Sequence, residues 1–588
     1  MNKFSFSLLV LLTAFLAGHA VEPSGTLPVL VIETKNSQPI ESKSTYVKGT
    51  YYLDPRGAEG IEAIGTAENP LPLQIKGRGN FTWYSFSKKP YRLKLDKKAA
   101  LLGMNSSKHY ALLAHADDNR AFMRNLSGFE VSRMAGLSWT PADQPCEVML
   151  NGDYIGLYFL TETIRFDKKR INLSNPDDAV EDWLEANPGK TAADYPFTEE
   201  DYTGPWLVEL DNNPDEFQVT VPSRQREEAV LRVTHKTPED YVTDAHRQWL
   251  IKEFDEIDRL IYAPDNANGG WLEKIDLTDA ARFFVVNQIL NNYESYSGSC
   301  YLTKDKGEGQ KWHFGPVWDF GSAFQATRDQ TKWIWESNYI QHWVGNMWNC
   351  QAFRDEVKRI FMAMEAEGFD RIFDYQNAYA ARIAKAAERD ALRWQSEGYG
   401  NPDMATPLAE VQKQLSDGIN SFGYKLGIEG YTQPVDLPSN DIYLRGGDYS
   451  GWGAMEENRF EDKGGLIYEL KVPVLSGEFK LAGPEWNSGN VDFGLPGGQQ
   501  LTLGKTYTLT QSGQNMSLAA GSAEDVTLRF DWNTKELTIT HTSGIVSAIA
   551  DENAPAEYYN LQGIRVEKPL SGHLYIVKRG ESTTKTVY

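Results

Sequence analysis

Hydrophobic and polar residues alternate in short runs over the first third of the chain, and this period of two predicts strands. The clearest runs cover residues 30–33, 71–76, 91–95, 148–150 and 154–160. Asn151-Gly152 separates the last two runs, and both residues tolerate the positive φ angles of a tight hairpin turn. One helix is expected to interrupt the strands over residues 119–135 and to end at Gly136.

The middle of the chain changes from a mixed pattern to a helical one. Strands are predicted at residues 206–210, 301–302 and 312–314, and Asp276 is a good N-cap for an apolar helix that runs to about residue 290. Further along, apolar residues recur at the spacing of one helix face, at Val357, Ile360, Phe361 and Met364. Helices are also predicted over residues 378–394 and 404–422. We therefore expect an α+β domain with a helical extension over residues 345–426.

The last part of the chain returns to short alternating runs that are rich in Gly. After a change of composition at residues 431–438, strands are predicted at residues 466–472, 478–481, 507–510, 526–531 and 536–540. Short strands at this spacing predict an all-β sandwich over residues 441–542. Residues 554–588 form a short β tail, with strands predicted at 558–561 and 574–578.

The N-terminus has the three parts of a secretory signal peptide. An apolar run over residues 4–17 follows Lys3 and ends in Ala17-Gly18-His19-Ala20, whose small residues favour cleavage before Val21. The run is shorter than the roughly 20 residues that span a bilayer. An uncleaved anchor or a buried helix is the alternative. We expect export to the periplasm, the cell surface or the medium, with residues 1–20 removed and no transmembrane segment afterwards.

Composition narrows the class of partner. A chain of 588 residues exceeds the size of one hydrophobic core, so several domains are expected. Its formal charge of −22 argues against binding to nucleic acid, because phosphates require a basic surface. Cys146, Cys300 and Cys350 allow at most one disulfide and leave one thiol over. The sequence contains no CxxC spacing, so a structural zinc site is not expected.

The common catalytic and nucleotide-binding signatures, such as HExxH, GxSxG and the P-loop, are absent from the sequence. Asp211, Asn213 and Asp215 alternate like the start of a calcium-binding loop. However, Glu216 stands where the loop requires Gly, so a calcium site of this kind is not expected.

Several short motifs follow one another along the chain: KGRGNFTW (76–83), KPYRLKL (89–95), LLGM (101–104), RN (124–125), VMLNGDYIGLY (148–158), TE (161–162), NNYESY (291–296) and GPVWDFG (315–321). Their order and wording resemble the CotH family of spore-coat kinase-like proteins over about residues 27–430, with the specific motifs between 76 and 324. The resemblance implies an atypical protein-kinase-like domain of two lobes. It also implies ATP and Mg²⁺, or another divalent metal, between the lobes, and transfer of phosphate to Ser or Thr of a protein substrate.

Phosphoryl transfer requires a cation on the phosphates, and the resemblance suggests three residues that hold the nucleotide. Lys94 lies in an alternating strand, like the phosphate-binding lysine of a kinase; an exposed strand lysine is the alternative. Arg78 lies between two Gly in a loop that suits phosphate, or in a plain turn. Glu162 ends a strand at the expected hinge. Arg124 and Asn125 match a family pair, although Asn at a helix start is also a common cap.

The resemblance assigns the catalytic and metal-binding roles to three further residues. Asp319 lies in Trp-Asp-Phe-Gly, similar to the kinase DFG element that ligates metal; a helix cap or ion pair is the alternative. Glu294 stands where the family carries its catalytic Asp, and its extra methylene moves the carboxylate by about an ångström. Ser299 lies near the position of the family's metal-binding Asn, and a hydroxyl is a weaker ligand. A catalytically inactive kinase fold that acts as an adhesin, scaffold or glycan-binding surface protein is therefore the competing hypothesis.

The C-terminal parts suggest a surface location. Trp452, Trp486 and Trp532 lie in a region loosely similar to starch-binding outer-membrane modules of Bacteroidetes, so they bind glycan or belong to the core. Residues 558–566 and 572–577 are similar to the C-terminal sorting segments of exported Bacteroidetes proteins, or form a final hairpin. Expected partners are a protein substrate or surface partner, and a glycan.

Overall fold

The computed structural model describes residues 21–118, 121–215, 217–226, 228–324, 332–336, 342–399, 403–432, 438, 440–486, 490–497, 499–542, 555–560, 565–569, 574–579 and 582–587. The expected signal peptide lies outside these residues. The described residues up to 432 form one compact unit, and those from 438 onward belong to a second.

The first unit begins with a closed barrel of seven strands in the order β1-β2-β3-β4-β5-β7-β6. The strands are β1 (Val29–Thr34), β2 (Val47–Asp54), β3 (Leu71–Gly77), β4 (Tyr91–Ala99), β5 (Ser107–Leu113), β6 (Asp143–Leu150) and β7 (Asp153–Glu162). All neighbours are antiparallel except β1 and β6, whose parallel pairing closes the barrel. The predicted hairpin turn is confirmed, with φ of 52° at Asn151 and 78° at Gly152.

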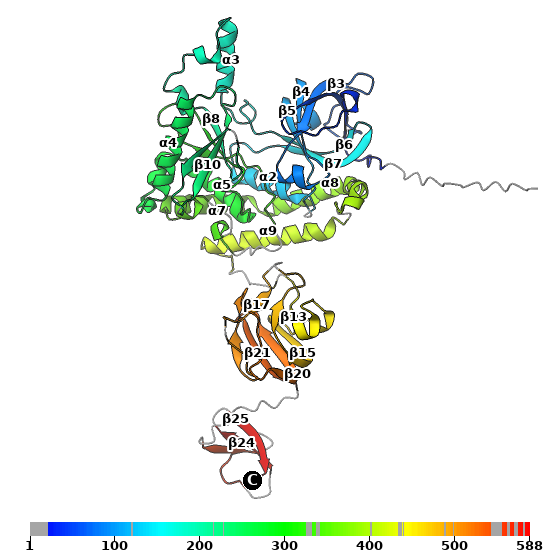
Figure 1. Cartoon of the computed structure of the whole chain (residues 1–588), viewed down its shortest axis with the longest axis vertical. Coiled ribbons are helices and arrows are strands. Elements are labelled where there is room, and N and C mark those ends of the chain that lie inside the picture. The colour runs from blue at the N-terminus through cyan, green and yellow to red at the C-terminus, as the bar shows by residue number, and fades with distance from the viewer. Residues whose placement is uncertain are drawn as a thin grey trace, which may run out of the picture. The chain divides into compact units, whose positions relative to one another are not determined.

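The rest of the first unit is a five-stranded sheet surrounded by helices. The sheet has the order β12-β11-β8-β10-β9, with β8 (Trp206–Leu210), β9 (Gln218–Pro222), β10 (Val230–Thr237), β11 (Cys300–Lys304) and β12 (His313–Phe314). The helices are α1 (Phe81–Ser85), α2 (Met123–Ala135), α3 (Pro176–Ala186), α4 (Asp244–Ile261), α5 (Leu277–Ile289), α6 (Val344–Met347), α7 (Gln351–Glu367), α8 (Asp370–Trp394) and α9 (Ala405–Lys425). Barrel and sheet lie side by side above α7, α8 and α9 (Figure 1). The expected mixture of helix and sheet is confirmed.

Two hydrophobic cores hold this unit together. The barrel interior is lined by alternate strand residues such as Leu30, Ile75 and Leu93. The larger core takes Ala111 and Leu113 from the outer face of β5, and combines them with residues of the second sheet and of α2, α4, α5, α7, α8 and α9. The outer face of β5 therefore joins the barrel to the rest of the unit.

Two predicted helix boundaries are wrong for local reasons. The helix expected over 119–135 begins at Met123, because Ala121 and Phe122 have positive φ angles of 57° and 60°. Its predicted end is confirmed, since Gly136 follows with φ of 78°. The helix expected from 378 begins at Asp370, where Ile372 and Gln376 already continue its buried face.

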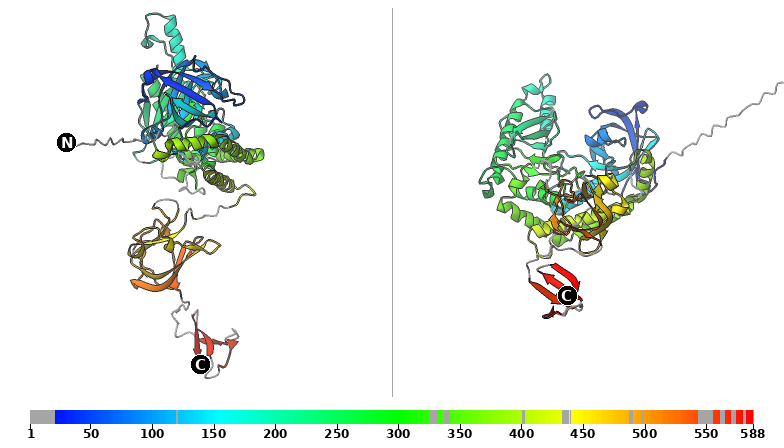
Figure 2. Two further views of the ribbon diagram at one scale, coloured as in Figure 1. Left: turned by 90° about the vertical axis from the view of Figure 1, so that its right-hand side faces the viewer. Right: turned by 60° about the horizontal axis from the view of Figure 1, so that its bottom comes forward.

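The second unit contains two antiparallel sheets that share one core, seen in yellow and orange in Figure 2. One has the order β13-β16-β17-β19, with β13 (Tyr443–Gly446), β16 (Phe479–Ala482), β17 (Asp492–Gly494) and β19 (Thr510–Gln511). The other has the order β14-β15-β20-β21-β18, with β14 (Glu461–Asp462), β15 (Ile467–Ser476), β18 (Thr506–Thr508), β20 (Ser522–Asp531) and β21 (Glu536–His541). The short helix α10 (Gly447–Ser450) follows β13. Trp532 is buried in the core.

The C-terminal residues form a small sheet of their own. Its order is β23-β22-β24-β25, with β22 (Ala556–Tyr559), β23 (Arg565–Val566), β24 (Leu574–Arg579) and β25 (Ser582–Val587). All of its neighbouring strands are antiparallel.

The three cysteines are buried and free, so none of them forms the disulfide that the sequence allowed. None of the helices in the described part of the chain combines the length and the apolar character needed to cross a bilayer.

A buried ion pair fixes the barrel to α8. Lys88 Nζ lies 2.8 Å from Asp390 Oδ1, and both side chains are at most 2% exposed. The same carboxylate accepts the Leu157 N–H at 2.9 Å, while Lys88 donates to the Leu157 carbonyl at 2.8 Å. Gly156 makes this approach feasible, because a Cβ there would collide with Asp390. Strand β7 and α8 are thus joined through a desolvated ion pair.

Replacing Asp390 by Ala should destabilise the first unit by about 3–5 kcal/mol, because Lys88 would stay buried without its counter-ion. Urea denaturation followed by hydrogen exchange in β7 and α8 measures the change. As a matched control, Asp417→Ala removes the exposed pair with Lys413 on α9 and should cost below about 1 kcal/mol. Equal effects of the two substitutions would contradict a special role for the buried pair.

Candidate functional site

Asp319 lies in a loop after β12 whose backbone is held from two directions. The Asn125 side chain accepts the Phe320 N–H at 3.0 Å, and the Asn292 side chain donates to the Asp319 carbonyl at 3.0 Å. The Phe320 ring packs directly on Gly128 of α2, where a Cβ would collide with it. The Asp319 carboxylate itself is exposed, and its Oδ1 accepts the Gly321 N–H at 2.9 Å. A fixed backbone thus presents an accessible carboxylate.

Glu294 lies in the turn after α5, next to the Asp319 loop. Asn292, which bonds to Asp319, precedes it by two residues. The Glu294 carbonyl accepts the N–H groups of Ser297 and Gly298, and its side chain is half-exposed. Ser299 closes the turn with φ of 50°. The hydrogen bond from Asn292 therefore connects the segment that carries Glu294 to the Asp319 loop, and the catalytic and metal-binding roles of Glu294, Ser299 and Asp319 stay predictions.

Arg78 connects the barrel to this group. It lies in the loop after β3, with its guanidinium carbon 5.4 Å from the centre of the Trp318 ring. Burial lowers the pKa of Arg78, and the carboxylate of Asp319 opposes that shift more than any other group. Tyr301 and Glu209 of the second sheet add to the same field. Arg78 is thus a barrel residue whose charge faces acidic groups of the second sheet.

Five basic residues, Lys76, Arg92, Lys94, His109 and Arg165, form what we call the basic strip. Lys76 is directly opposite Arg92 between β3 and β4, and Lys94 is directly opposite His109 between β4 and β5. Lys76 and Arg92 carry like charges, which are destabilising in such cross-strand positions. The strip shares the outer face of β5 with Ala111 and Leu113, which belong to the core shared with the second sheet. It therefore faces the second sheet and not the barrel interior.

Electrostatics and hydrogen bonding distinguish the strip from the rest of the barrel surface. Burial, together with the charges of Arg165, Arg92 and Lys94, lowers the pKa of His109 to about 3, so its imidazole is neutral near pH 7. Burial also lowers the pKa values of Lys76 and Arg165. Arg92 Nε and His109 Nδ1 are buried without a hydrogen-bond partner in the described part of the chain. An anion bound here would offset this repulsion and supply the missing partners.

The predicted nucleotide-binding residues occupy different places relative to the strip. Lys94 is exposed and belongs to it, whereas Arg92 is the strip residue that acts electrostatically on Arg78. Glu162 is buried behind the strip, 3.7 Å from Arg170, and accepts the Ala142 N–H. Arg170 in turn donates to the His109 carbonyl at 3.3 Å.

Sequence reasoning missed part of this site. The sequence pattern does not single out four residues of the strip, namely Lys76, Arg92, His109 and Arg165. Arg92 nevertheless lies in the same alternating YRLKL run as Lys94. Strand register, which sequence alone does not reveal, brings four of the five residues into opposed pairs. Asn125 is also not a helix cap: α2 is preceded by Phe122, and the Asn125 side chain holds Phe320.

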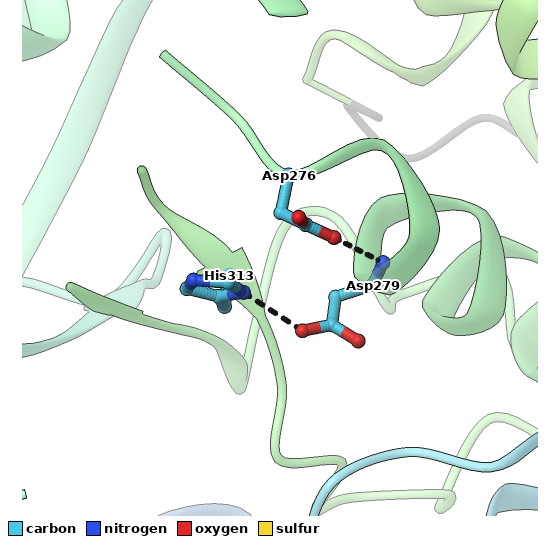
Figure 3. A group of neighbouring side chains, drawn as sticks. All are labelled: Asp276, Asp279 and His313. Atoms are coloured by element: carbon cyan, nitrogen blue, oxygen red, sulfur yellow. Dashed lines mark hydrogen bonds and ion pairs between the residues drawn. The ribbon is translucent and has the colours of Figure 1, made fainter. Parts of the chain in front are cut away.

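A second cluster lies at the start of α5, where Asp276, Asp279 and His313 approach one another (Figure 3). Carboxylate and imidazole groups can bind divalent metals. Here, however, Asp276 caps the helix by accepting the Asp279 N–H at 2.9 Å. Asp279 bonds to His313 at 2.8 Å and to Arg282 at 3.1 Å. Both carboxylates therefore already have structural roles. Arg282 supplies positive charge next to Asp279, as a bound metal ion would.

The hydrogen bond with Asp279 raises the pKa of His313, and His313 and Arg282 together keep the pKa of Asp279 below its usual value despite burial. The stabilisation from the charged pair is complete below the ordinary His pKa of about 6.5 and is lost as pH rises through the raised value. An NMR titration should find the pKa of His313 above 6.5 in the wild type and lower in Asp279→Asn. An unchanged His313 pKa in the variant would contradict the ion pair.

Comparison with known proteins agrees with this arrangement of motifs. The family described as CotH kinase protein matches residues 75–420, which include the basic strip, Arg78, Glu294 and Asp319. No match was found among curated proteins. Since the family match covers more than half of the 588 residues, the chain belongs to the CotH kinase protein family.

Proposed function

We propose that this protein transfers phosphate from ATP to a Ser or Thr hydroxyl of a protein, with Mg²⁺ or another divalent metal. The observation that carries the proposal is the basic strip, whose opposed cations lead to Arg78 and through it to Asp319. Glu239 acts on Lys76, and Asp167 and Asp178 act on Arg165, yet burial and the neighbouring cations still lower both pKa values. Cations clustered in this way are unexpected in a chain of net charge −22 unless they bind an anion. The family match supports the same chemistry.

The strip suits the polyphosphate of a nucleotide. The Lys76–Arg92 and Lys94–His109 pairs are two residues apart along β4, or about 7 Å. That separation suits contacts of the two pairs with opposite ends of the triphosphate chain, which long side chains can reach. Lys94 thus shares the phosphates with Arg92, and Arg78 lies at the end nearest Asp319. Glu162 contributes indirectly, by holding Arg170 against the His109 strand.

Asp319 and Ser299 are the proposed metal ligands. Hard divalent cations prefer oxygen ligands, and both side chains offer oxygen. Oδ1 of Asp319 accepts the Gly321 N–H, and the carboxylate is exposed, so the carboxyl group suits a bound cation. The metal would neutralise charge on the phosphates.

Glu294 is the proposed base. Its carboxylate accepts the proton of the substrate hydroxyl while the hydroxyl oxygen bonds to the terminal phosphorus. The bond between that phosphorus and the bridging oxygen breaks, and ADP leaves with the bonding electrons. The half-exposed position of Glu294 leaves its side chain accessible to a protein substrate.

The wider assignment rests on the sequence and on the architecture of each unit. We interpret the barrel as one lobe of an atypical kinase-like fold and the second sheet with its helices as the other. The two sheets of residues 443–541 are interpreted as a β-sandwich. The signal peptide of residues 1–20 and the sorting-like residues 554–588 support export, to the periplasm, the cell surface or the medium.

Asp319→Ala should abolish phosphate transfer with ATP and Mg²⁺, because the metal loses a ligand. Arg92→Gln should weaken ATP binding about tenfold or more, since charge-assisted hydrogen bonds are worth about 1.5–3 kcal/mol. Isothermal titration with ATP and Mg²⁺ measures the latter. Lys385→Gln removes an exposed charge from α8, outside the strip, and should leave ATP affinity unchanged. If the wild type binds no ATP in the presence of divalent metal, the proposal fails.

A second candidate function, glycan binding by the second unit, is favoured by one local arrangement. Trp486 is 42% exposed, and its ring centre lies 6.1 Å from that of Trp452. The Arg445 guanidinium stacks 3.8 Å from Trp486 and donates to the Trp452 carbonyl. Trp452 has φ of 66°, an unfavourable angle for a bulky residue, which is consistent with a functional constraint. Indole faces held in this way can stack on sugar rings.

If the rings bind glycan, Trp486→Ala should reduce retardation of the protein in affinity gels that contain soluble polysaccharide. Trp452→Ala should do the same. Val474→Ala, which trims an exposed apolar side chain of β15 on the other sheet of this unit, is the control and should leave mobility unchanged. A glycan array on which the wild type binds nothing would remove this candidate.

A further inference from the structure

The short helix α1 directly follows the Arg78 loop and presents aromatic rings to solvent. Trp83 is buried against Gly77, where a Cβ would collide with the indole. Phe81 and Tyr84, three residues apart on the same side of the helix, are 65% and 73% exposed. They are the two most exposed large apolar side chains in the described part of the chain.

Two half-buried rings extend this aromatic surface beyond α1. Phe86 lies 5.5 Å from Phe81 and 5.3 Å from Tyr399, measured between ring centres. We call Phe81, Tyr84, Phe86 and Tyr399 the aromatic lip. Contiguous exposed apolar surface on a soluble protein marks an interaction site.

Hydrogen bonds keep the lip in place. The Ser87 N–H donates to the Tyr399 hydroxyl at 3.2 Å, and the Ser87 hydroxyl donates to Glu397 at 3.0 Å. Lys89 donates to the Trp83 carbonyl. The lip is therefore a preformed surface, and binding to it requires little ordering of its rings.

The lip carries a positive charge at its Tyr84 end, whereas the acidic Glu397 lies at its Tyr399 end. Lys43 lies 4.9 Å from the centre of the Tyr84 ring and donates to Asn80 at 2.6 Å. A partner that buries these rings must therefore bring an acidic group to Lys43, or leave its charge without compensation. This complementarity favours a partner with both apolar and acidic side chains.

The lip is also close to the proposed transfer site. Phe81 follows Arg78 by three residues, so their Cα atoms are at most about 11 Å apart. An extended polypeptide advances about 3.3 Å per residue. Because the charge of Arg78 acts on Asp319, a segment on the lip lies beside the loop that carries a residue of the proposed transfer site.

We propose that the aromatic lip docks an extended, apolar and acidic segment of the protein substrate beside the phosphorylated residue. This inference rests on the proposed function, because it names the substrate class of the same site. The nucleotide is assigned to the basic strip, which leaves the rings of α1 free for the polypeptide.

The test measures peptide binding and phosphate transfer separately on the full chain. The probe is an array of 13-residue peptides with a central Ser, in which Phe or Leu near the Ser is combined with Asp. A matched set replaces Phe and Leu by Ala. The wild type should bind the apolar set at least tenfold more tightly, and the double variant Phe81→Ala/Tyr84→Ala should lose this preference.

Two further variants control for folding and position. Tyr424→Ala removes an exposed aromatic side chain of α9 and should bind like the wild type. Lys43→Glu leaves the rings intact and should weaken binding of the Asp-containing peptides while improving that of Lys-containing ones. ATP and Mg²⁺ are then added, and phosphate on each peptide is measured.

The outcomes separate the docking inference from the proposed chemistry. Selective binding that depends on the two rings, without phosphate on any peptide, supports the docking surface and refutes the phosphotransferase. Phosphate transfer without preference for apolar residues refutes the docking surface alone. Loss of ATP affinity in the double variant with peptide binding retained assigns the rings to the adenine and overturns the inference. So does a change of oligomeric state, which assigns them to a second copy of the chain.

Discussion

The buried pair of Lys88 and Asp390 joins the two halves of the first unit. It bonds β7 of the barrel to α8, a helix that begins more than 200 residues later in the chain. Such a pair is sensitive to geometry, because each charge gives up its hydration only if the other lies close by. The neighbouring outer face of β5 packs into the larger core through Ala111 and Leu113. The position of the barrel, and therefore of its basic strip, depends on this contact.

The basic strip locally destabilises the sheet that carries it. Lys76 is opposite Arg92, and Lys94 is opposite His109, in a protein with a large excess of acidic residues. A fold selected for stability alone would place acidic residues in such cross-strand positions. Charges of one sign that are kept at close range suggest a ligand of the opposite sign. This is the physical basis of the proposal that the strip binds phosphate.

The site also shows how a loop residue can be positioned by groups from distant parts of the chain. Asp319 has little regular structure of its own, yet Asn125 of α2 and Asn292 after α5 both bond to its loop. Because Gly128 has no Cβ, the Phe320 ring of this loop can pack directly against α2. Substitution of Asn125, Asn292 or Gly128 would therefore act on Asp319 without touching substrate. The position of this carboxylate is therefore set by backbone contacts from α2 and from the turn after α5.

The sequence by itself determined much of this protein. Period-two runs predicted β1, β3, β4, β6 and β7, Asn151-Gly152 predicted their hairpin, and Asp276 predicted the start of α5. The ordered motifs identified the family, and they singled out Arg78, Glu294 and Asp319. These signals are local, because they arise from alternation, capping and turn geometry. Only the tertiary structure decided that Arg92 adjoins Arg78, that Lys76 and His109 join the strip, and that Glu162 pairs with Arg170. Strand register and long-range packing set these contacts, and neither leaves a local trace in the sequence.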